Sequence, residues 1–132
     1  MKTTTTWKKK HEFQSLQHHS SIELDGSTKN GFSPKALLLS GIAACSGIDV
    51  VDILEKMRVP FSRFSIETSS EQTEEHPRVF KEIRLVYHMD IPPTEEDKLR
   101  KAIELSLEKY CGVAAMLKKN SPIHYEIVIE KN

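Results

Sequence analysis

The sequence has no excess of charge of either sign, because 19 Lys and Arg residues balance 19 Asp and Glu residues. No net positive field therefore exists to hold nucleic acid or an anionic lipid surface. The one basic cluster, Lys8–Lys10, is too short to argue for nucleic acid and is more typical of a solvated strand edge. We expect neither a nucleic-acid partner nor a membrane partner.

Long apolar runs and a leader sequence are also missing. No segment reaches the roughly 18 uninterrupted apolar residues that a membrane span needs. The first residues, MKTTTTWKKKHEF, contain no apolar stretch of the kind found in a secretory signal. With 132 residues, the chain is expected to form one domain over residues 1–132 and to reside in the cytoplasm.

Cysteine is scarce, with only Cys45 and Cys111 in the chain. A reducing compartment does not favour a permanent disulfide. Each cysteine is therefore either a small buried hydrophobe or a reactive thiol. No C-x-x-C or H-x-x-x-H spacing accompanies the six histidines, which argues against zinc. The sequence predicts no metal and no cofactor.

The apolar pattern predicts strands and helices in a mixed order. The predicted elements are two strands within residues 7–24 with a turn near 8–14, a helix over 34–58 capped by Ser33, strands over 61–72 and 79–89, a helix capped by Thr94, a short helix over 113–119 and a last strand over 123–129. Strand pairs next to helices are typical of an α+β fold with a largely antiparallel sheet. Trp7 and Tyr87 are expected to pack in the interior.

The first half of the helix over 34–58 is apolar on every side, which predicts burial on all faces. A second layer must then cover it, and in so small a chain the simplest supplier is another copy of the protein. Ile48 is expected on the apolar face of the second half. Asp49 is expected to be partly buried, with a hydrogen-bond partner or a basic residue beside it.

Small residues surround Cys45 in SGIAACSGID, and two of them are Gly41 and Gly47. A glycine inside a helix costs about 1 kcal/mol relative to alanine, so close helix contact or room for a ligand should justify it. Both interpretations stay open. Cys45 lies in mid-helix and needs a nearby cation to become a thiolate, whereas Cys111 is expected in the first turn of a short helix, where N–H groups favour a thiolate.

The two cysteines come within bonding range if their helices pack together. Such a pair suits a peroxide-reducing dithiol, in which one thiolate becomes a sulfenic acid and the second thiol condenses with it to a disulfide. Two other hypotheses remain. One is a non-catalytic protein that binds an apolar small molecule, and the other is a protein in which both cysteines only pack.

Three segments resemble the OsmC/Ohr family of osmotically inducible and organic hydroperoxide resistance proteins. They are SPKALLLSGIAACSGIDVVDILEKMRVP around Cys45, HPRVFKEIRLVYHM, and LSLEKYCGVAAML around Cys111. They lie in the family's order over roughly residues 20–130. The run from Cys45 to Val51, C-x-x-I-D-V-V, resembles an OsmC-like branch of that family.

The resemblance implies an intertwined homodimer in which an antiparallel sheet wraps around two central helices, with active sites at the subunit interface. It implies that Cys45 attacks an organic hydroperoxide, that Cys111 resolves the product, and that a dithiol is the reductant. The substrate pocket is expected to include Arg78, Asp49, Gly41 and Tyr110.

The sequence departs from the family pattern at one point. Peroxidase members use an arginine from the N-terminal region, held by a glutamate near the start of the central helix. Lys35 stands at the glutamate position, and no arginine precedes Arg58. Arg78 is therefore the candidate cation. The missing pair also supports the alternative of an OsmC-like dimer that binds an apolar molecule without peroxidase activity.

Overall fold

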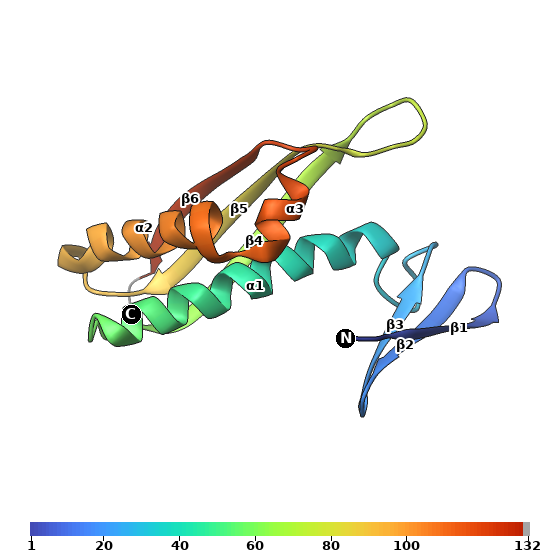
Figure 1. The fold of residues 1–132 in the computed structure, drawn as a ribbon, viewed down its shortest axis with the longest axis horizontal. Helices are drawn as coiled ribbons and strands as arrows, with labels where there is room; N and C mark the ends of the chain where they lie inside the picture. The colour runs from blue at the N-terminus through green and yellow to red at the C-terminus, as the bar shows by residue number, and fades with distance from the viewer. Residues whose placement is uncertain (131–132) are drawn as a thin grey trace. The chain divides into compact units, whose positions relative to one another are not determined.

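The computed structural model describes residues 1–130 as a mixed α+β protein (Figure 1), which confirms the predicted fold class. Its elements are β1 (Thr4–Lys9), β2 (Glu12–Gln17), β3 (Ser20–Asp25), α1 (Pro34–Lys56), β4 (Ser62–Gln72), β5 (Phe80–Asp90), η1 (Pro93–Glu95), α2 (Glu96–Leu105), η2 (Ser106–Tyr110), α3 (Gly112–Leu117) and β6 (Ile123–Glu130). The chain divides into two compact units, residues 1–38 and the part from residue 39 onward. The single domain over residues 1–132 stays a prediction.

The first unit contains three strands in the order β1-β2-β3, all antiparallel, and not the two strands that the sequence predicts. Two features hide the third strand. β1 is exposed along its whole length, so it carries no buried alternation. The reversal at His18 has a φ angle of 54°, a left-handed conformation that a sequence usually signals with glycine, whereas the reversal at Lys10 lies within the predicted turn near residues 8–14.

One face of this three-stranded sheet is apolar and uncovered within its unit. Trp7 pairs with Phe13, which pairs with Leu24, and Ile22 lies two residues before Leu24 on the same face. Trp7, Phe13 and Ile22 are 62%, 38% and 45% exposed. Trp7 is therefore exposed in the single chain, and its role as a packing residue stays a prediction.

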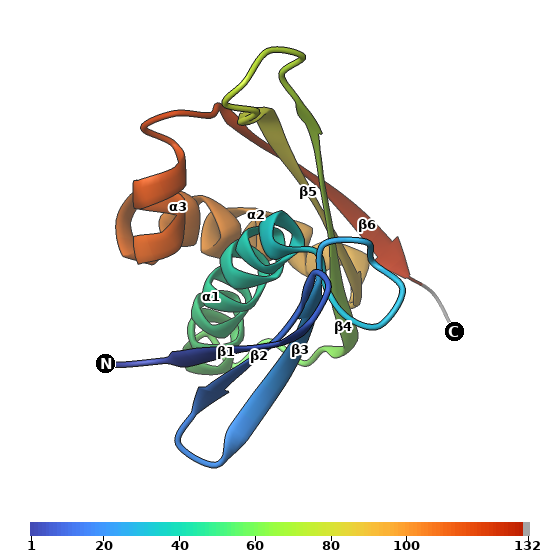
Figure 2. The same ribbon diagram turned by 90° about the vertical axis from the view of Figure 1, so that its right-hand side faces the viewer.

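The second unit is built on the sheet β4-β5-β6. β4 and β5 pair antiparallel, whereas β5 and β6 pair in parallel, because the chain crosses over through α2 and α3 between them. The helices lie against one face of this sheet (Figure 2). With three antiparallel pairings and one parallel pairing, the strand pairing is largely antiparallel, as predicted.

The core lies between this sheet and the helices. β5 is the central strand, and Leu85, Tyr87 and Met89 on its inner face are fully buried. They form one cluster with residues of α1 and α2. The helix residues in that cluster are Ile42, Val50, Leu54, Leu99, Ala102 and Ile103. Tyr87 is thus an interior residue, as predicted.

α1 begins as the sequence predicts, with Ser33 Oγ accepting the backbone N–H of Ala36 at 3.3 Å. It ends at Lys56 and not at residue 58, because Arg58 adopts a left-handed φ of 58°. By length and composition alone α1 is apolar enough to cross a membrane, a property that core helices of soluble proteins share.

The single chain covers only one side of α1. Its fully buried residues form one stripe at four-residue spacing, namely Ile42, Ser46, Val50 and Leu54. Leu38 and Ile48 are 47% and 63% exposed. The burial of α1 on all faces, which the sequence assigns to a second copy, stays a prediction, as does the place of Ile48 on a covered face.

The helices after β5 begin one residue away from where the sequence places them, but α2 begins in a different way. Thr94 lies inside the 3-10 turn η1 and does not cap α2, whose first residue is Glu96 and whose N-cap makes no side-chain hydrogen bond. The predicted break near residues 109–112 is a π-helical turn, η2. α3 then begins at Gly112, one residue earlier than predicted.

Candidate functional site

The two cysteines lie in the second unit on elements that pack together. Cys45 is half-buried on α1 and belongs to the residues that contact the core cluster. Cys111 is buried between η2 and α3 and is 3% exposed. Both are free thiols, and Cys45 lies near enough to Cys111 to raise the pKa of its thiol. The two cysteine-bearing segments therefore pack against one core, and disulfide range between the sulfurs stays a prediction.

Cys111 is the N-cap residue of α3, and its Sγ accepts the backbone N–H of Ala114 at 3.3 Å. The expected N–H contact is therefore present, but burial of the thiol has a larger effect on its pKa. Burial, together with the neighbouring Cys45 thiol, raises the pKa of the Cys111 thiol to about 11 against the lowering effect of Ala114. Cys111 is therefore a protonated thiol at neutral pH, despite the favourable N–H contact that the sequence predicts.

A buried chain of hydroxyl groups runs beside the two thiols. The Tyr87 hydroxyl lies 2.7 Å from Ser46 Oγ, Ser46 Oγ lies 2.9 Å from Ser106 Oγ, and Ser106 Oγ donates to Asp49 Oδ2 at 2.9 Å. Ser46 and Ser106 are fully buried. The chain joins α1, the central strand β5 and the π-helical turn η2.

Burial raises the pKa of Tyr87 to about 12, because an ionised phenol would lose its hydration in the core. The hydrogen bond with Ser46 opposes that rise, while the charges of Cys111, Tyr125 and Asp49 add to it. Tyr87 is therefore a neutral phenol at neutral pH. Its hydroxyl is available as a hydrogen-bond donor inside the site.

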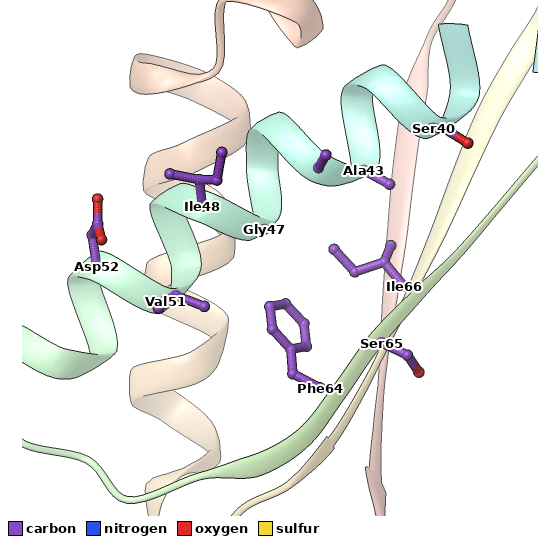
Figure 3. A pocket seen from close by; sticks show the side chains of 10 residues that line it. Ser40, Ala43, Gly47, Ile48, Val51, Asp52, Phe64, Ser65 and Ile66 are labelled. Carbon is purple, nitrogen blue, oxygen red and sulfur yellow. The ribbon is translucent and has the colours of Figure 1, made fainter. Parts of the chain in front are cut away.

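A shallow apolar groove of about 540 Å³ lies between α1 and β4. Small residues form its α1 side, and Phe64 and Ile66 point toward α1 from β4 (Figure 3). The residues that line it are Ser40, Ala43, Ala44, Gly47, Ile48, Val51, Asp52, Phe64, Ser65 and Ile66. The small residues beside Cys45 thus leave space that β4 only partly fills.

The structure separates the four residues expected in a substrate pocket, and none of them lines this groove. Arg78 is exposed in the loop between β4 and β5, which projects beyond the sheet (Figure 1). Tyr110 is 55% exposed, with the Lys109 ammonium 5.4 Å from its ring centre. Gly41 is half-buried on α1. Their place in a substrate pocket stays a prediction.

Asp49 fulfils the expectation for its own surroundings. It is half-buried, and Ser106 is its hydrogen-bond partner. Ser46, Tyr87 and Ser106 are the members of the site that sequence reasoning missed. Asp49 itself was the available signal, because a carboxylate on a helix that packs in a core requires partners.

Metal binding finds no support in the described residues. Within residues 1–130, no group of three or more His, Cys, Asp and Glu side chains is arranged to hold a metal ion.

Residues 24–126, which are most of the chain, match the OsmC-like protein family. The chain is also 39% identical to Protein YhfA of Escherichia coli K12 over 98 residues, which cover 73% of each protein.

Two solved structures show the same fold. A hypothetical protein from Aquifex aeolicus VF5 superposes with a TM-score of 0.84 at 31% identity, covering 98% of this chain and 97% of its own. The organic hydroperoxide resistance protein OhrB of Bacillus subtilis superposes with a TM-score of 0.71 at 15% identity, covering 96% of each chain. The second likeness concerns the fold alone.

Proposed function

The chain belongs to the OsmC-like protein family, and from that premise we propose that it reduces organic hydroperoxides with the thiols of Cys45 and Cys111. One observation carries the proposal, namely that two free thiols from distant parts of the sequence pack at one core, with Cys45 close enough to raise the pKa of Cys111. The name of the OhrB relative, an organic hydroperoxide resistance protein, supports the choice of organic hydroperoxides as the substrate class.

In the proposed reaction the Cys45 thiolate attacks the peroxide O–O bond, and one oxygen stays on its sulfur. The products are Cys45 sulfenic acid and, after protonation of the leaving alkoxide, an alcohol. The Cys111 thiol then condenses with the sulfenic acid, which gives a disulfide and releases water. A dithiol reductant restores both thiols and leaves as its own disulfide.

The surroundings of the two sulfurs support this order of attack. Cys111 is 3% exposed, so a peroxide has little access to its sulfur. Its pKa is raised, so it is a protonated thiol at neutral pH and a poor nucleophile. Cys45 is more exposed and is the sulfur that a substrate can approach. We assign attack to Cys45 and resolution to Cys111.

We further propose that the working form is a homodimer in the cytoplasm. Two apolar surfaces are uncovered in the single chain: the sheet face with Trp7, Phe13 and Ile22, and the side of α1 with Leu38 and Ile48. A second copy is the simplest cover for both. Arg78 is exposed, and we propose it as the cation that assembly brings to a Cys45 thiolate, with Asp49, Gly41 and Tyr110 around the substrate.

The test is a count of free thiols in the denatured protein before and after one equivalent of cumene hydroperoxide, with Cys45→Ser and Cys111→Ser in parallel. The proposal predicts that the wild type loses both thiols within seconds. Cys111→Ser should lose one thiol to a sulfenic acid that dimedone traps, and Cys45→Ser should keep its thiol. A Cys45→Ser variant that reacts like the wild type would overturn the assignment.

The groove between α1 and β4 favours a second candidate function, the binding of an apolar small molecule without peroxidase activity. Its walls are apolar, and its volume suits a ligand of modest size. Native mass spectrometry of the purified protein separates the two functions. A ligand that copurifies, together with thiols that resist peroxide, would favour the binding protein.

A further inference from the structure

Ser106 contacts both cysteine-bearing segments through different atoms. Its backbone carbonyl accepts the N–H of Cys111 at 2.7 Å. Its hydroxyl group lies 2.9 Å from Ser46 Oγ and 2.9 Å from Asp49 Oδ2. Ser46 follows Cys45 in the chain, and Asp49 lies one helical turn further along α1. Ser106 therefore connects the backbone of Cys111 to the turn of α1 that carries Cys45.

The Ser106 hydroxyl group is the donor of this chain toward α1. It donates to Ser46 Oγ and to Asp49 Oδ2, each at 2.9 Å, and lies 3.5 Å from the Ser46 carbonyl oxygen. Ser46 Oγ in turn bonds to the Tyr87 hydroxyl at 2.7 Å. Removal of the Ser106 hydroxyl would take a partner from Ser46, which is fully buried, and an unsatisfied buried polar group costs about 1–3 kcal/mol.

The backbone at Cys111 is held by the same residue. The Cys111 N–H bond to the carbonyl of Ser106 closes the π-helical turn η2, because it spans five residues. Directly after this turn the backbone becomes extended at Cys111, with φ −77° and ψ 105°, and the thiol caps α3. The position of the Cys111 sulfur therefore depends on where Ser106 is fixed.

We propose that Ser106 is a positioning residue that holds Cys111 in reach of Cys45. This inference rests on the proposed function, in which the two thiols must form a disulfide. It concerns the geometry of the pair, and it can be measured without peroxide. Two thiols that are held together form a disulfide with glutathione disulfide more favourably than two thiols that are not. That reaction turns both thiols and one glutathione disulfide into the protein disulfide and two glutathione thiols.

The experiment equilibrates the full chain with glutathione buffers of graded ratio and measures the fraction of Cys45–Cys111 disulfide by mass spectrometry. Ser106→Ala should lower the equilibrium constant at least roughly tenfold, which for a two-electron couple is about 30 mV. Ser121→Ala is the matched control. Ser121 is also a buried serine with a hydrogen bond to a backbone carbonyl, that of Phe80 at 2.9 Å, but it lies outside this network. Its equilibrium constant should stay within about twofold of the wild type.

Ser46→Ala provides a second test if Ser106→Ala does not fold. It removes the hydrogen bond between the hydroxyl groups of Ser46 and Ser106 and leaves the bond from Ser106 to Asp49. It should lower the equilibrium constant in the same direction. A wild type that forms no such disulfide, or a Ser106→Ala or Ser46→Ala variant that matches the wild type, would overturn the proposal. The same proteins treated with cumene hydroperoxide separate the two ideas. If peroxide leaves the wild-type thiols intact while Ser106→Ala lowers the glutathione equilibrium, the proposed function fails and the positioning role stands.

Discussion

Two opposing effects act on the pKa of Cys111. The N–H of Ala114 lowers it, burial raises it, and the effect of burial is the larger. The result suits a resolving thiol. A protonated sulfur is a poor nucleophile toward free peroxide, yet it sits beside the sulfur that would become a sulfenic acid. The same burial protects Cys111 from reagents in solution. At the scale of the residue, the environment of each sulfur therefore favours one role over the other.

The raised pKa of Cys111 predicts a loss of stability at high pH. Both folded and unfolded chains keep the thiol proton below the ordinary thiol pKa of 9.0, so the contribution is fully present there. Above it the unfolded chain loses the proton while the folded chain retains it up to a pKa of about 11. Unfolding is then favoured by roughly 1.4 kcal/mol for each pH unit, or about 2–3 kcal/mol over this window.

Urea unfolding at intervals from pH 8 to pH 10 measures this effect. Tyr87, with its pKa raised to about 12, begins to contribute only above the ordinary phenol pKa of 10.0. The comparison therefore belongs below pH 10. Cys111→Ala should flatten the slope of unfolding free energy against pH in that range. Equal slopes in the two proteins would show that Cys111 titrates alike in the folded and unfolded chains.

Tyr87→Phe tests the hydroxyl chain from its other end. The substitution leaves Ser46 without its phenol partner, and a lost buried hydrogen bond costs about 1–2 kcal/mol in the free energy of unfolding. Tyr125→Phe is the control, because the Tyr125 hydroxyl bonds to Glu104 near the surface and its loss should cost about 0.5 kcal/mol or less. Equal losses of unfolding free energy for the two variants would show that the buried hydroxyl chain stabilises the fold no more than a surface hydrogen bond does.

At the scale of the element, α1 carries two glycines that its own chain does not require. A Cβ atom built at Gly41 meets nothing within 4 Å, and one built at Gly47 meets only the side chains of Ile66 at 3.4 Å and Phe64 at 3.8 Å. Each glycine still weakens the helix by about 1 kcal/mol relative to alanine. Contact inside the chain does not explain them, which leaves a partner copy or a ligand.

Gly41→Ala should therefore raise the stability of the isolated chain by up to about 1 kcal/mol while weakening the proposed dimer. Urea unfolding at low protein concentration measures the first effect. Sedimentation velocity over a concentration series measures the second. Glu55→Ala, at an exposed position of the same helix, is the control for helix propensity. A Gly41→Ala dimer as tight as the wild type would argue that no partner packs at this position.

The elements differ in how well the sequence predicts them, and the reasons are local. α1, β4 and β5 were predicted to within two residues, because proline, a serine cap and clear alternation mark their ends. The turn at His18 was missed, because it uses a left-handed conformation at histidine. The cap of α2 was also missed, because the helix begins through a 3-10 turn that leaves Thr94 without a capping role.

At the scale of the whole molecule, the uncovered apolar surfaces need an explanation that one copy does not supply. Ile48 is 63% exposed on a helix whose opposite stripe is fully buried. If a second copy covers this side, Ile48→Glu should place a charge in the interface and raise the dimer dissociation constant at least roughly a hundredfold. Lys56→Glu, at the exposed end of the same helix, is the control. An Ile48→Glu protein that sediments like the wild type would contradict the proposed assembly.

The candidate site was only partly visible in the sequence. Two scarce cysteines and a family resemblance predicted the thiol pair, and in the structure both cysteines pack at the same core. Ser46 and Ser106 stand 60 positions apart in the chain, and serine is too common for such a pair to be noticed. Only the packing of η2 on α1 reveals that they share one hydrogen-bond chain with Tyr87.

The most direct measurement is the second-order rate constant for the reaction of Cys45 with cumene hydroperoxide in the Cys111→Ser protein, compared with free cysteine at the same pH. A thiol peroxidase should react at least roughly a hundredfold faster than free cysteine, because a protein site that catalyses a reaction must lower its barrier by several kcal/mol. A rate equal to that of free cysteine would contradict the peroxidase proposal and would leave the groove beside α1 as the feature to explain.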